Sequence, residues 1–391
     1  MRAEEAGVRP TYLDHNATTP VDPRVLDAML PWFAEAFGNP SSVEHFHGNE
    51  AASAVRRARE TIAAAIGARD NEIVFTGSCT EANNMAVLGS ARAYPDRRHV
   101  ITSLIEHPSV VEPFRQLERE GYKVSWLGVD EQGRVSPADV ANAIQADTAL
   151  VSVMAANNEV GTLQPIAEIG AICEGRGVLF HTDLAQAMAH RRVSVAAEHI
   201  HLASISGHKA YGPKGVGALY VRSRGPRARL EPITFGGGQE KGLRSGTLNV
   251  PLIVGLAEAV RIAAAQGEED AARLRVMRDR FEASVRAAVD GVSLNGHPTE
   301  RLPSLSSLSI AGVEPLALMH RLNHRASFSA SSACATDKVE TSHVLKAMFG
   351  DGARARQAFR VSPGRFTTAA EMEAFTTALV DQVVSLRRFA A

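Results

Sequence analysis

Short apolar stretches alternate with longer amphipathic stretches over the first two thirds of the chain. The apolar stretches have the length and the flanking turn residues of buried strands. They cover residues 72–75, 99–103, 123–127, 149–155, 178–182, 202–206 and 217–221. Between most of them apolar residues recur at helical spacing, which predicts helices over residues 81–94, 109–120, 136–143 and 166–176. This alternation predicts a mostly parallel sheet covered by helices on both faces.

The pattern changes toward both ends of the chain. Near the N-terminus, Asp22-Pro23 predicts a helix start, and an Ala/Arg/Glu-rich stretch predicts a long helix over about residues 48–66. From about Pro251 the sequence predicts a long helix over residues 252–288, then short strands and a final helix over 370–389. We therefore expect two domains. Residues 16–260 would form the large one, and residues 1–15 with 261–391 a smaller α+β one.

Composition excludes several classes of protein. The formal net charge is −1 over 391 residues with no long run of one sign, so direct binding of nucleic acid or of a membrane surface is not expected. Residues 1–10 lack the apolar core of a signal peptide, and no uncharged apolar stretch approaches 18 residues, so no membrane span is expected. The three cysteines cannot all pair and their spacing fits no metal site, so we expect a reducing, cytoplasmic setting and free thiols.

Polar side chains gather where the predicted strands end. In sheets of this kind, ligands bind at the carboxyl ends of the strands. Thr76, Glu106-His107, Asn157-Asn158, Asp183 and Lys209 all fall at such ends. This edge of the sheet is therefore the candidate site.

Lys209 lies in the most informative stretch, residues 204–217. There a strand ends in small residues and leads into Gly207-His208-Lys209 and a turn rich in Gly and Pro. Partial burial and nearby positive charge lower the pKa of a lysine and leave a neutral amine that attacks aldehydes. An isolated Ser-x-His-Lys is more often a surface loop. The preceding strand ends, which carry Asp183 and His107, favour a cofactor site instead.

With residues 181–186 and His107, this stretch resembles the cysteine desulfurases, in the class V aminotransferase group of pyridoxal phosphate enzymes. The resemblance extends from about Tyr12 to Leu386, with several independent motifs in the family's order. It implies an α/β fold of the fold-type-I pyridoxal-phosphate-dependent transferases. That fold has a large, mostly parallel sheet domain and a smaller α+β C-terminal domain.

The resemblance also implies roles in holding pyridoxal 5'-phosphate. Lys209 would hold the cofactor, Asp183 would keep its pyridine nitrogen protonated, and His107 would stack on the ring and is a candidate for moving protons. The other implied contacts are Asn158 and Gln186 to the ring hydroxyl oxygen, and Ser206 and His208 to the phosphate.

Two further stretches are implied to bind the phosphate. In residues 75–81, backbone amides at a helix start and the Thr80 hydroxyl form a cradle, unless this is an ordinary helix cap. The family usually has Gly-Ala-Thr where this chain has Ser78-Cys79-Thr80. The Gly-rich loop 236–247 is either a mobile surface loop or, as in the family, reaches the neighbouring subunit's cofactor through Thr247. The second alternative implies a homodimer.

Cys334 and Arg360 are the implied substrate-handling residues. Cys334 lies among small polar residues, where a thiol is accessible, whereas Cys173 falls in a predicted helix and is expected in the core. The family commonly has Ser-Ser-Gly-Ser-Ala-Cys-Thr-Ser around this cysteine, but this chain lacks the glycine and has Ala335 in place of the threonine. Arg360, with Asn158, would bind the substrate carboxylate, although a surface ion pair is the alternative for the arginine.

These roles predict an enzyme that converts L-cysteine to L-alanine and leaves the sulfur on Cys334 as a persulfide. An acceptor protein would then take the sulfur for iron-sulfur cluster assembly, tRNA thiolation or DNA phosphorothioation. The alternatives are an aminotransferase, which needs no cysteine in that loop, a selenocysteine lyase, another β-lyase, and a scaffold that has lost catalysis.

Overall fold

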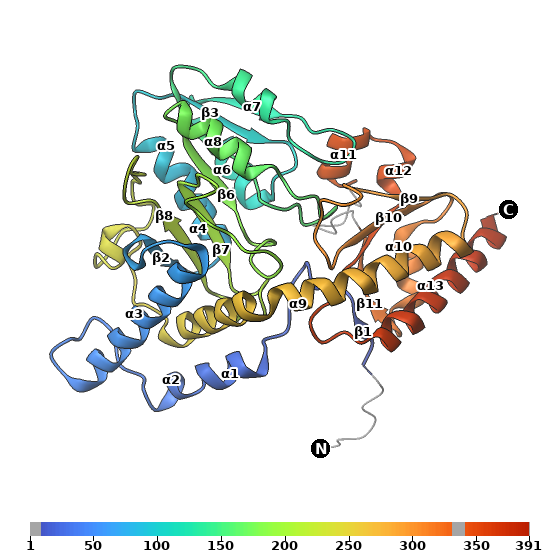
Figure 1. The fold of residues 1–391 in the computed structure, drawn as a ribbon, viewed down its shortest axis with the longest axis horizontal. Helices are drawn as coiled ribbons and strands as arrows, with labels where there is room; N and C mark the ends of the chain where they lie inside the picture. Colours follow the sequence, from blue (N-terminus) through green and yellow to red (C-terminus); the bar gives the residue numbers. More distant parts are fainter. Residues whose placement is uncertain (1–8, 331–340, 391) are drawn as a thin grey trace.

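The structure, a computed structural model, describes residues 9–330 and 341–390. A seven-stranded sheet forms its larger part (Figure 1), with the strand order β2-β8-β7-β6-β5-β3-β4. The strands are β2 (Ile73–Thr76), β3 (His99–Ser103), β4 (Lys123–Leu127), β5 (Thr148–Ser152), β6 (Leu179–Asp183), β7 (Leu202–Ser206) and β8 (Gly217–Val221). β8 runs antiparallel to both of its neighbours and the other pairs are parallel. The predicted mostly parallel sheet is confirmed.

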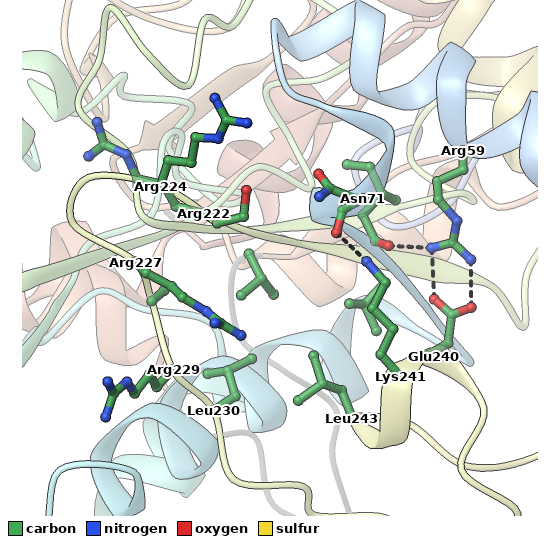
Figure 2. Close-up of a pocket in the computed structure, with 15 residues that line it drawn as sticks. Arg59, Asn71, Arg222, Arg224, Arg227, Arg229, Leu230, Glu240, Lys241 and Leu243 are labelled. Carbon is green, nitrogen blue, oxygen red and sulfur yellow. Dashed lines mark hydrogen bonds and ion pairs between the residues drawn. The ribbon is translucent and has the colours of Figure 1, made fainter.

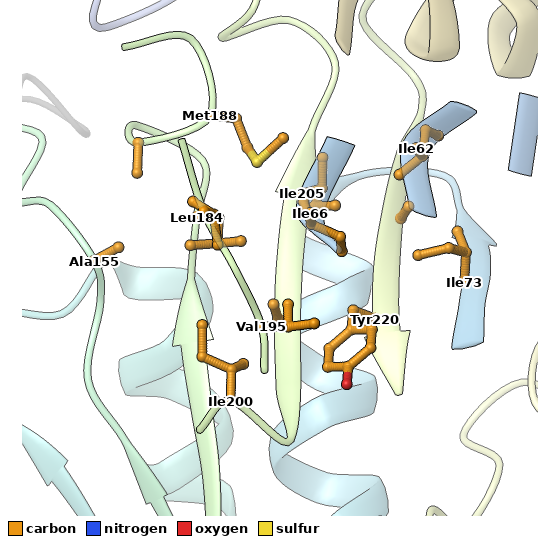
Figure 3. Close-up of a cluster of buried hydrophobic side chains, with 14 of the residues drawn as sticks. Ile62, Ile66, Ile73, Ala155, Leu184, Met188, Val195, Ile200, Ile205 and Tyr220 are labelled. Carbon is orange, nitrogen blue, oxygen red and sulfur yellow. The ribbon is translucent and has the colours of Figure 1, made fainter. Parts of the chain in front are cut away.

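Helices cover both faces of this sheet. One core contains α3 (Phe46–Ile66), α7 (Pro137–Ala143), α8 (Ile166–Gly175) and the first half of α9 (Val250–Ala288). Figure 3 shows part of it, where Ile62 and Ile66 of α3 lie against the strands. The opposite core contains α4 (Cys79–Asn84) and α6 (Pro108–Arg119). Neighbouring residues of β6, Leu179 and Phe180, point into opposite cores, which explains the continuous apolar runs of these strands.

The helix predicted over residues 81–94 is interrupted. It consists of α4, a π-helical segment η2 (Met85–Gly89) and α5 (Ser90–Arg92). Within it, the Ser90 hydroxyl donates to the Ala86 carbonyl, a contact that bends helices. A Cβ on Gly89 would lie 2.8 Å from the Glu231 carbonyl oxygen, so only glycine permits this close approach.

The smaller part is built on a four-stranded antiparallel sheet with the order β12-β13-β10-β9. Its strands are β9 (Val292–Leu294), β10 (Ser306–Ile310), β12 (Ser329–Ala330) and β13 (Ala358–Val361). The second half of α9, α10 (Pro315–Leu322) and α13 (Ala369–Ala390) cover it around a core that includes Phe281, Phe359 and Phe375. Two short helices, α11 (His343–Phe349) and α12 (Ala353–Arg356), belong to this part of the sequence.

The N-terminal segment joins both parts. Strand β1 (Thr11–Tyr12) pairs in parallel with β11 (Ala326–Ser327), and α1 (Pro23–Met29) and α2 (Pro31–Ala34) follow it. α9 runs without a break past residue 260 and packs on α1, α3 and α13 (Figure 1). The predicted boundary at 260/261 therefore falls within one continuous helix.

α9 is also the described helix that is long and apolar enough to cross a membrane by composition. However, 56% of its most apolar stretch is buried inside the protein, where Ile253, Leu256 and Val260 contribute to the main core. This is the position of a core helix.

Candidate functional site

The site lies at the carboxyl edge of the large sheet, as the sequence predicts. Asp183 is the last residue of β6, and Lys209 follows β7 by three residues. His107 follows β3, and the turn of Gly77 and Ser78 follows β2.

The environment of Lys209 lowers the pKa of its amine. Burial and the charge of Arg360 lower its pKa to about 8, while Asp183, Asp14 and Cys79 act in the opposite direction. Its Nζ donates to the carbonyl oxygens of Asn16 at 2.6 Å and Ala17 at 2.7 Å. The amine is therefore held in place by the N-terminal segment and is partly deprotonated near neutral pH.

Asp183 is buried and accepts three hydrogen bonds. Oδ1 accepts from the Ala185 backbone N–H at 2.8 Å and from the Cys79 thiol at 3.6 Å. Oδ2 accepts from Asn83 Nδ2 at 2.8 Å. These donors hold the carboxylate rigidly, and an ionised carboxylate still has capacity for one more donor.

The turn after β2, which the resemblance implies to be a phosphate cradle, is held by contacts within the chain, where the Gly77 N–H donates to the Glu81 carboxylate. Ser78 accepts from the Glu81 N–H as the N-cap of α4, and Thr80 is exposed. A Cβ on Gly217 would lie 2.7 Å from the carbonyl carbon of Ser78, so glycine permits this turn to pack on β8. Ser206 Oγ is buried and has no hydrogen-bond partner in the described part of the chain. An orphaned hydroxyl next to Lys209 in sequence fits a site that awaits a polar ligand.

His107 is the N-cap of α6. Its Nδ1 lies 3.1 Å from the Ser109 backbone N and 2.7 Å from Ser109 Oγ. Loss of solvent around the ring and the charge of Lys209 lower the pKa of His107, and the charge of Asp183 partly opposes this effect. The ring is therefore mainly neutral at neutral pH. The residue is exposed to solvent.

The segment that follows β1 belongs to the site, which the sequence did not predict. Asn16 Nδ2 donates to Gln186 Oε1 at 3.0 Å, and Gln186 Nε2 donates back to the Asn16 carbonyl at 2.9 Å. Thr18 Oγ1 lies 3.1 Å from His208 Nδ1, and burial lowers the pKa of His208 to about 4. Both Gln186 and His208 lie near Lys209, but they contact the N-terminal segment. Their implied cofactor contacts stay a prediction.

Arg360 reaches the site from β13 of the smaller part. Its guanidinium donates to Asp14 Oδ1 at 2.6 Å and to the Asn158 carbonyl at 2.7 Å. Its Nε is buried and has no partner within residues 9–330 and 341–390. The ion pair with Asp14 is largely buried rather than a surface pair. Asn158 thus lies beside Arg360 through its backbone carbonyl, and a shared role of the two residues in binding substrate stays a prediction.

Two strand-end residues turn inward instead. Glu106 is fully buried and accepts from Ser103 Oγ at 2.6 Å and the Met154 N–H at 3.0 Å. Burial raises the pKa of Glu106 to about 8. Asn157 is buried as well and donates to the Ile105 carbonyl. Both hold the backbone near the site.

Two expected residues are not seen beside Lys209 in the part of the chain that the structure describes, one of them because it lies outside that part. Cys334 falls between the described residues 330 and 341. Thr247 is exposed, although the same loop approaches the cradle through Arg244, whose Nε donates to Glu81 Oε1 at 2.7 Å. The described residues show no group of three or more His, Cys, Asp or Glu side chains that would hold a metal ion.

A separate basic cavity of about 920 Å³ lies at the opposite edge of the large sheet. Ile73 at the start of β2 and Val221 at the end of the antiparallel β8 line it, so it faces away from Lys209. Figure 2 shows its cationic side chains, which include Arg59, Arg222, Arg224, Arg227, Arg229 and Lys241. It is not part of the Lys209 site.

The chain is similar to known proteins over nearly its full length. The family model for class-V aminotransferases matches residues 11–375. The cysteine desulfurase of Pongo abelii is 46% identical over 388 residues, which cover 98% of this chain and 84% of the relative. A solved NifS-like protein superposes with a TM-score of 0.89 at 35% identity, covering 96% of this chain and 99% of that one. A solved structure of SspA in complex with cysteine gives 0.80 at 36% identity, covering 92% of this chain and 100% of that one. The chain therefore belongs to the cysteine desulfurase family, within the class-V aminotransferases.

Proposed function

We propose that this protein uses pyridoxal 5'-phosphate to convert L-cysteine to L-alanine and retains the sulfur on Cys334. The observation that carries the proposal is the placement of Lys209 beside Asp183 and Arg360, with a pKa lowered to about 8. The similarity to cysteine desulfurases and to SspA in complex with cysteine supports the activity and the substrate.

The described residues fit this cofactor. Lys209 offers an amine to an aldehyde, Asp183 offers a carboxylate to a ring nitrogen, and Ser206 offers a buried, unpaired hydroxyl near the cradle. When bound, the cofactor supplies an electron sink for charge that develops at the substrate α-carbon. Asp183 keeps the ring nitrogen protonated, which strengthens that sink.

The chain's own residues do the rest. Arg360 binds the substrate carboxylate and so orients the α-carbon. The neutral amine of Lys209 takes the α-proton and returns one to the product. Cys334 forms an S–S bond to the substrate sulfur as the C–S bond breaks, which leaves a persulfide on the enzyme and frees alanine.

Neither of the other two cysteines fits the sulfur-carrying role. Burial and the charge of Asp183 raise the pKa of Cys79, and burial raises the pKa of Cys173 to about 12. Both stay protonated at neutral pH, whereas the thiolate is the nucleophile. Cys334 is the remaining cysteine of the three in the sequence.

The direct test is to find the sulfur. After a single exposure of the protein to L-cysteine, with excess removed and accessible thiols alkylated, peptide mass spectrometry should show the added sulfur on the Cys334 peptide. The Cys79 and Cys173 peptides serve as internal controls. Sulfur on either of those, or alanine and sulfide formed with no persulfide at all, would contradict the proposal.

Replacing Arg360 by lysine should raise the KM for L-cysteine by about tenfold or more and change kcat less, because the paired, charge-assisted hydrogen bonds to a carboxylate are lost. Steady-state kinetics of alanine formation measures both constants. The Arg365→Lys variant is the matched control, since Arg365 pairs with Asp22 and Asp270 instead. An equal KM in the Arg360→Lys variant would exclude this role.

The working unit we propose is a homodimer in which Thr247 reaches the neighbouring cofactor phosphate. Its exposure in the single chain and the contact of the same loop with the cradle through Arg244 support this arrangement. We also propose a cytoplasmic setting and transfer of the sulfur to an acceptor protein.

A further inference from the structure

Two side chains that no motif singled out connect His107 to Asp183. Asn83 lies on α4 and Ser109 on α6, and both are buried. Asn83 Nδ2 donates to Asp183 Oδ2 at 2.8 Å and to Ser109 Oγ at 2.8 Å. Ser109 Oγ lies 2.7 Å from His107 Nδ1. The four residues thus form one continuous chain of hydrogen bonds from the carboxylate to the imidazole.

The direction of each hydrogen bond follows from the chemistry of the groups. An ionised carboxylate only accepts, so the amide nitrogen of Asn83, not its oxygen, must face Asp183. In this orientation Asn83 Oδ1 is buried and has no hydrogen-bond partner among the described residues. The same nitrogen can only donate to Ser109 Oγ, which therefore accepts.

The single hydroxyl hydrogen of Ser109 is then left to point at His107 Nδ1. The backbone N–H of Ser109 donates to the same nitrogen at 3.1 Å. Two donors on Nδ1 require that this nitrogen carries no hydrogen, so the neutral ring must carry its hydrogen on Nε2.

We propose that Ser109 and Asn83 are positioning residues that hold His107 in the Nε2–H tautomer, with the ionised Asp183 as the group that sets the direction of the chain. Nε2 of the ring then carries a hydrogen, so it can donate a hydrogen bond to a bound group but cannot accept one. This inference rests on the proposed function, because it concerns the histidine of that site.

The charges around His107 make the effect of this chain measurable. Burial and the positive charge of Lys209 favour the neutral ring, and Asp183 favours the protonated one. Protonation of Nδ1 would also require the Ser109 hydroxyl to turn away from it. The hydrogen-bond chain therefore favours the neutral ring, whereas the charge of Asp183 favours the protonated ring. Asp183 is also the residue that orients the hydrogen-bond chain.

The test is nitrogen NMR of the full-length holoenzyme labelled with ¹⁵N-histidine, without substrate. The His107 signals are assigned by their loss in His107→Asn. We expect the wild-type signal of a bare Nδ1 and a protonated Nε2. Ser109→Ala should raise the pKa of His107 by about 0.5 to 1 and increase the fraction of rings with hydrogen on Nδ1. Ser109→Thr keeps the hydroxyl and should restore the wild-type values.

The Asn83→Ala variant tests whether Ser109 acts as part of the hydrogen-bond chain or only through its local contact with His107. It does not touch His107, yet it should shift the histidine in the same direction as Ser109→Ala, because it frees the Ser109 hydroxyl to rotate. If Asn83→Ala does not fold, the comparison of Ser109→Ala with Ser109→Thr decides alone.

A wild-type ring with hydrogen on Nδ1, or a Ser109→Ala protein with unchanged tautomer and pKa, would overturn the inference. The NMR signals are read without turnover. An inactive wild type would therefore count against the proposed function and not against the hydrogen-bond chain. The reverse result, an active enzyme with unaltered histidine signals in Ser109→Ala, would count only against the chain.

Discussion

Replacing Cys334 by alanine is expected to reduce alanine formation from L-cysteine to the background rate while the protein still binds its cofactor. The thiolate is the group that accepts the substrate sulfur, and an alanine methyl group cannot form the S–S bond. Cofactor binding should persist because the described residues that fit the cofactor, Lys209, Asp183 and Ser206, are untouched. An alanine and sulfide assay with a reductant, beside the visible absorbance of the purified variant, measures both outcomes.

Cys173→Ala is the matched control for this variant. Cys173 lies in the core formed by α8 and the large sheet, so its removal should leave turnover intact. Full activity in Cys334→Ala would refute the persulfide mechanism. A β-lyase or a selenium-specific enzyme, neither of which needs this thiol, would then be the better explanation.

Much of the large domain's secondary structure could be predicted because its strands are buried on both faces. β3, β4, β7 and β8 have the bounds that the apolar runs predict. The helix over residues 81–94 was predicted as continuous, but it contains a π-helical segment whose last residue, Gly89, packs closely against Glu231. No periodicity within the helix carries that information.

The site divides in the same way. Asp183 and Lys209 were predictable because Asp183 ends one strand and Lys209 lies three residues after its neighbour, and parallel strands bring such ends together. Asp14 and Asn16 were not, because their contacts with Arg360 and Lys209 depend on the pairing of β1 with β11, more than 300 residues away. The polar run Asp14-His15-Asn16 after a short extended segment was the one local signal.

Ser109 shows a different limit. Its residue type is common at helix starts, where a serine usually satisfies backbone groups. Here α4 and α6 pack together, and this places Ser109 between His107 and Asn83. Only the packing of two helices reveals that contact.

Replacing Lys209 by alanine is expected to lower the rate of alanine formation by about a hundredfold to ten-thousandfold. This is the usual range for loss of a general acid-base group. The variant loses both the amine that holds the cofactor and the base that takes the α-proton. A free amine added to the solution can restore part of the lost rate only where the missing group carries a proton. Partial rescue of Lys209→Ala by ethylamine would therefore identify the proton-transfer role of Lys209. Lys214→Ala is the control, because this lysine of the same loop is exposed and is not among the groups that shift the pKa of Lys209.

The wild-type pH dependence separates Lys209 from the other candidate bases. Its pKa is lowered to about 8, so the amine is mostly protonated at pH 7 and becomes a proton acceptor as the pH rises through 8. Activity should therefore fall as the pH drops below about 8. His107 and His208 have pKa values below the ordinary histidine value and are already neutral in that range. An activity limb near pH 8 that survives in Lys214→Ala would be as expected for Lys209 and would exclude Lys214 and the two histidines as its source. A flat profile between pH 7 and pH 9 would mean that a group other than its free amine limits proton transfer.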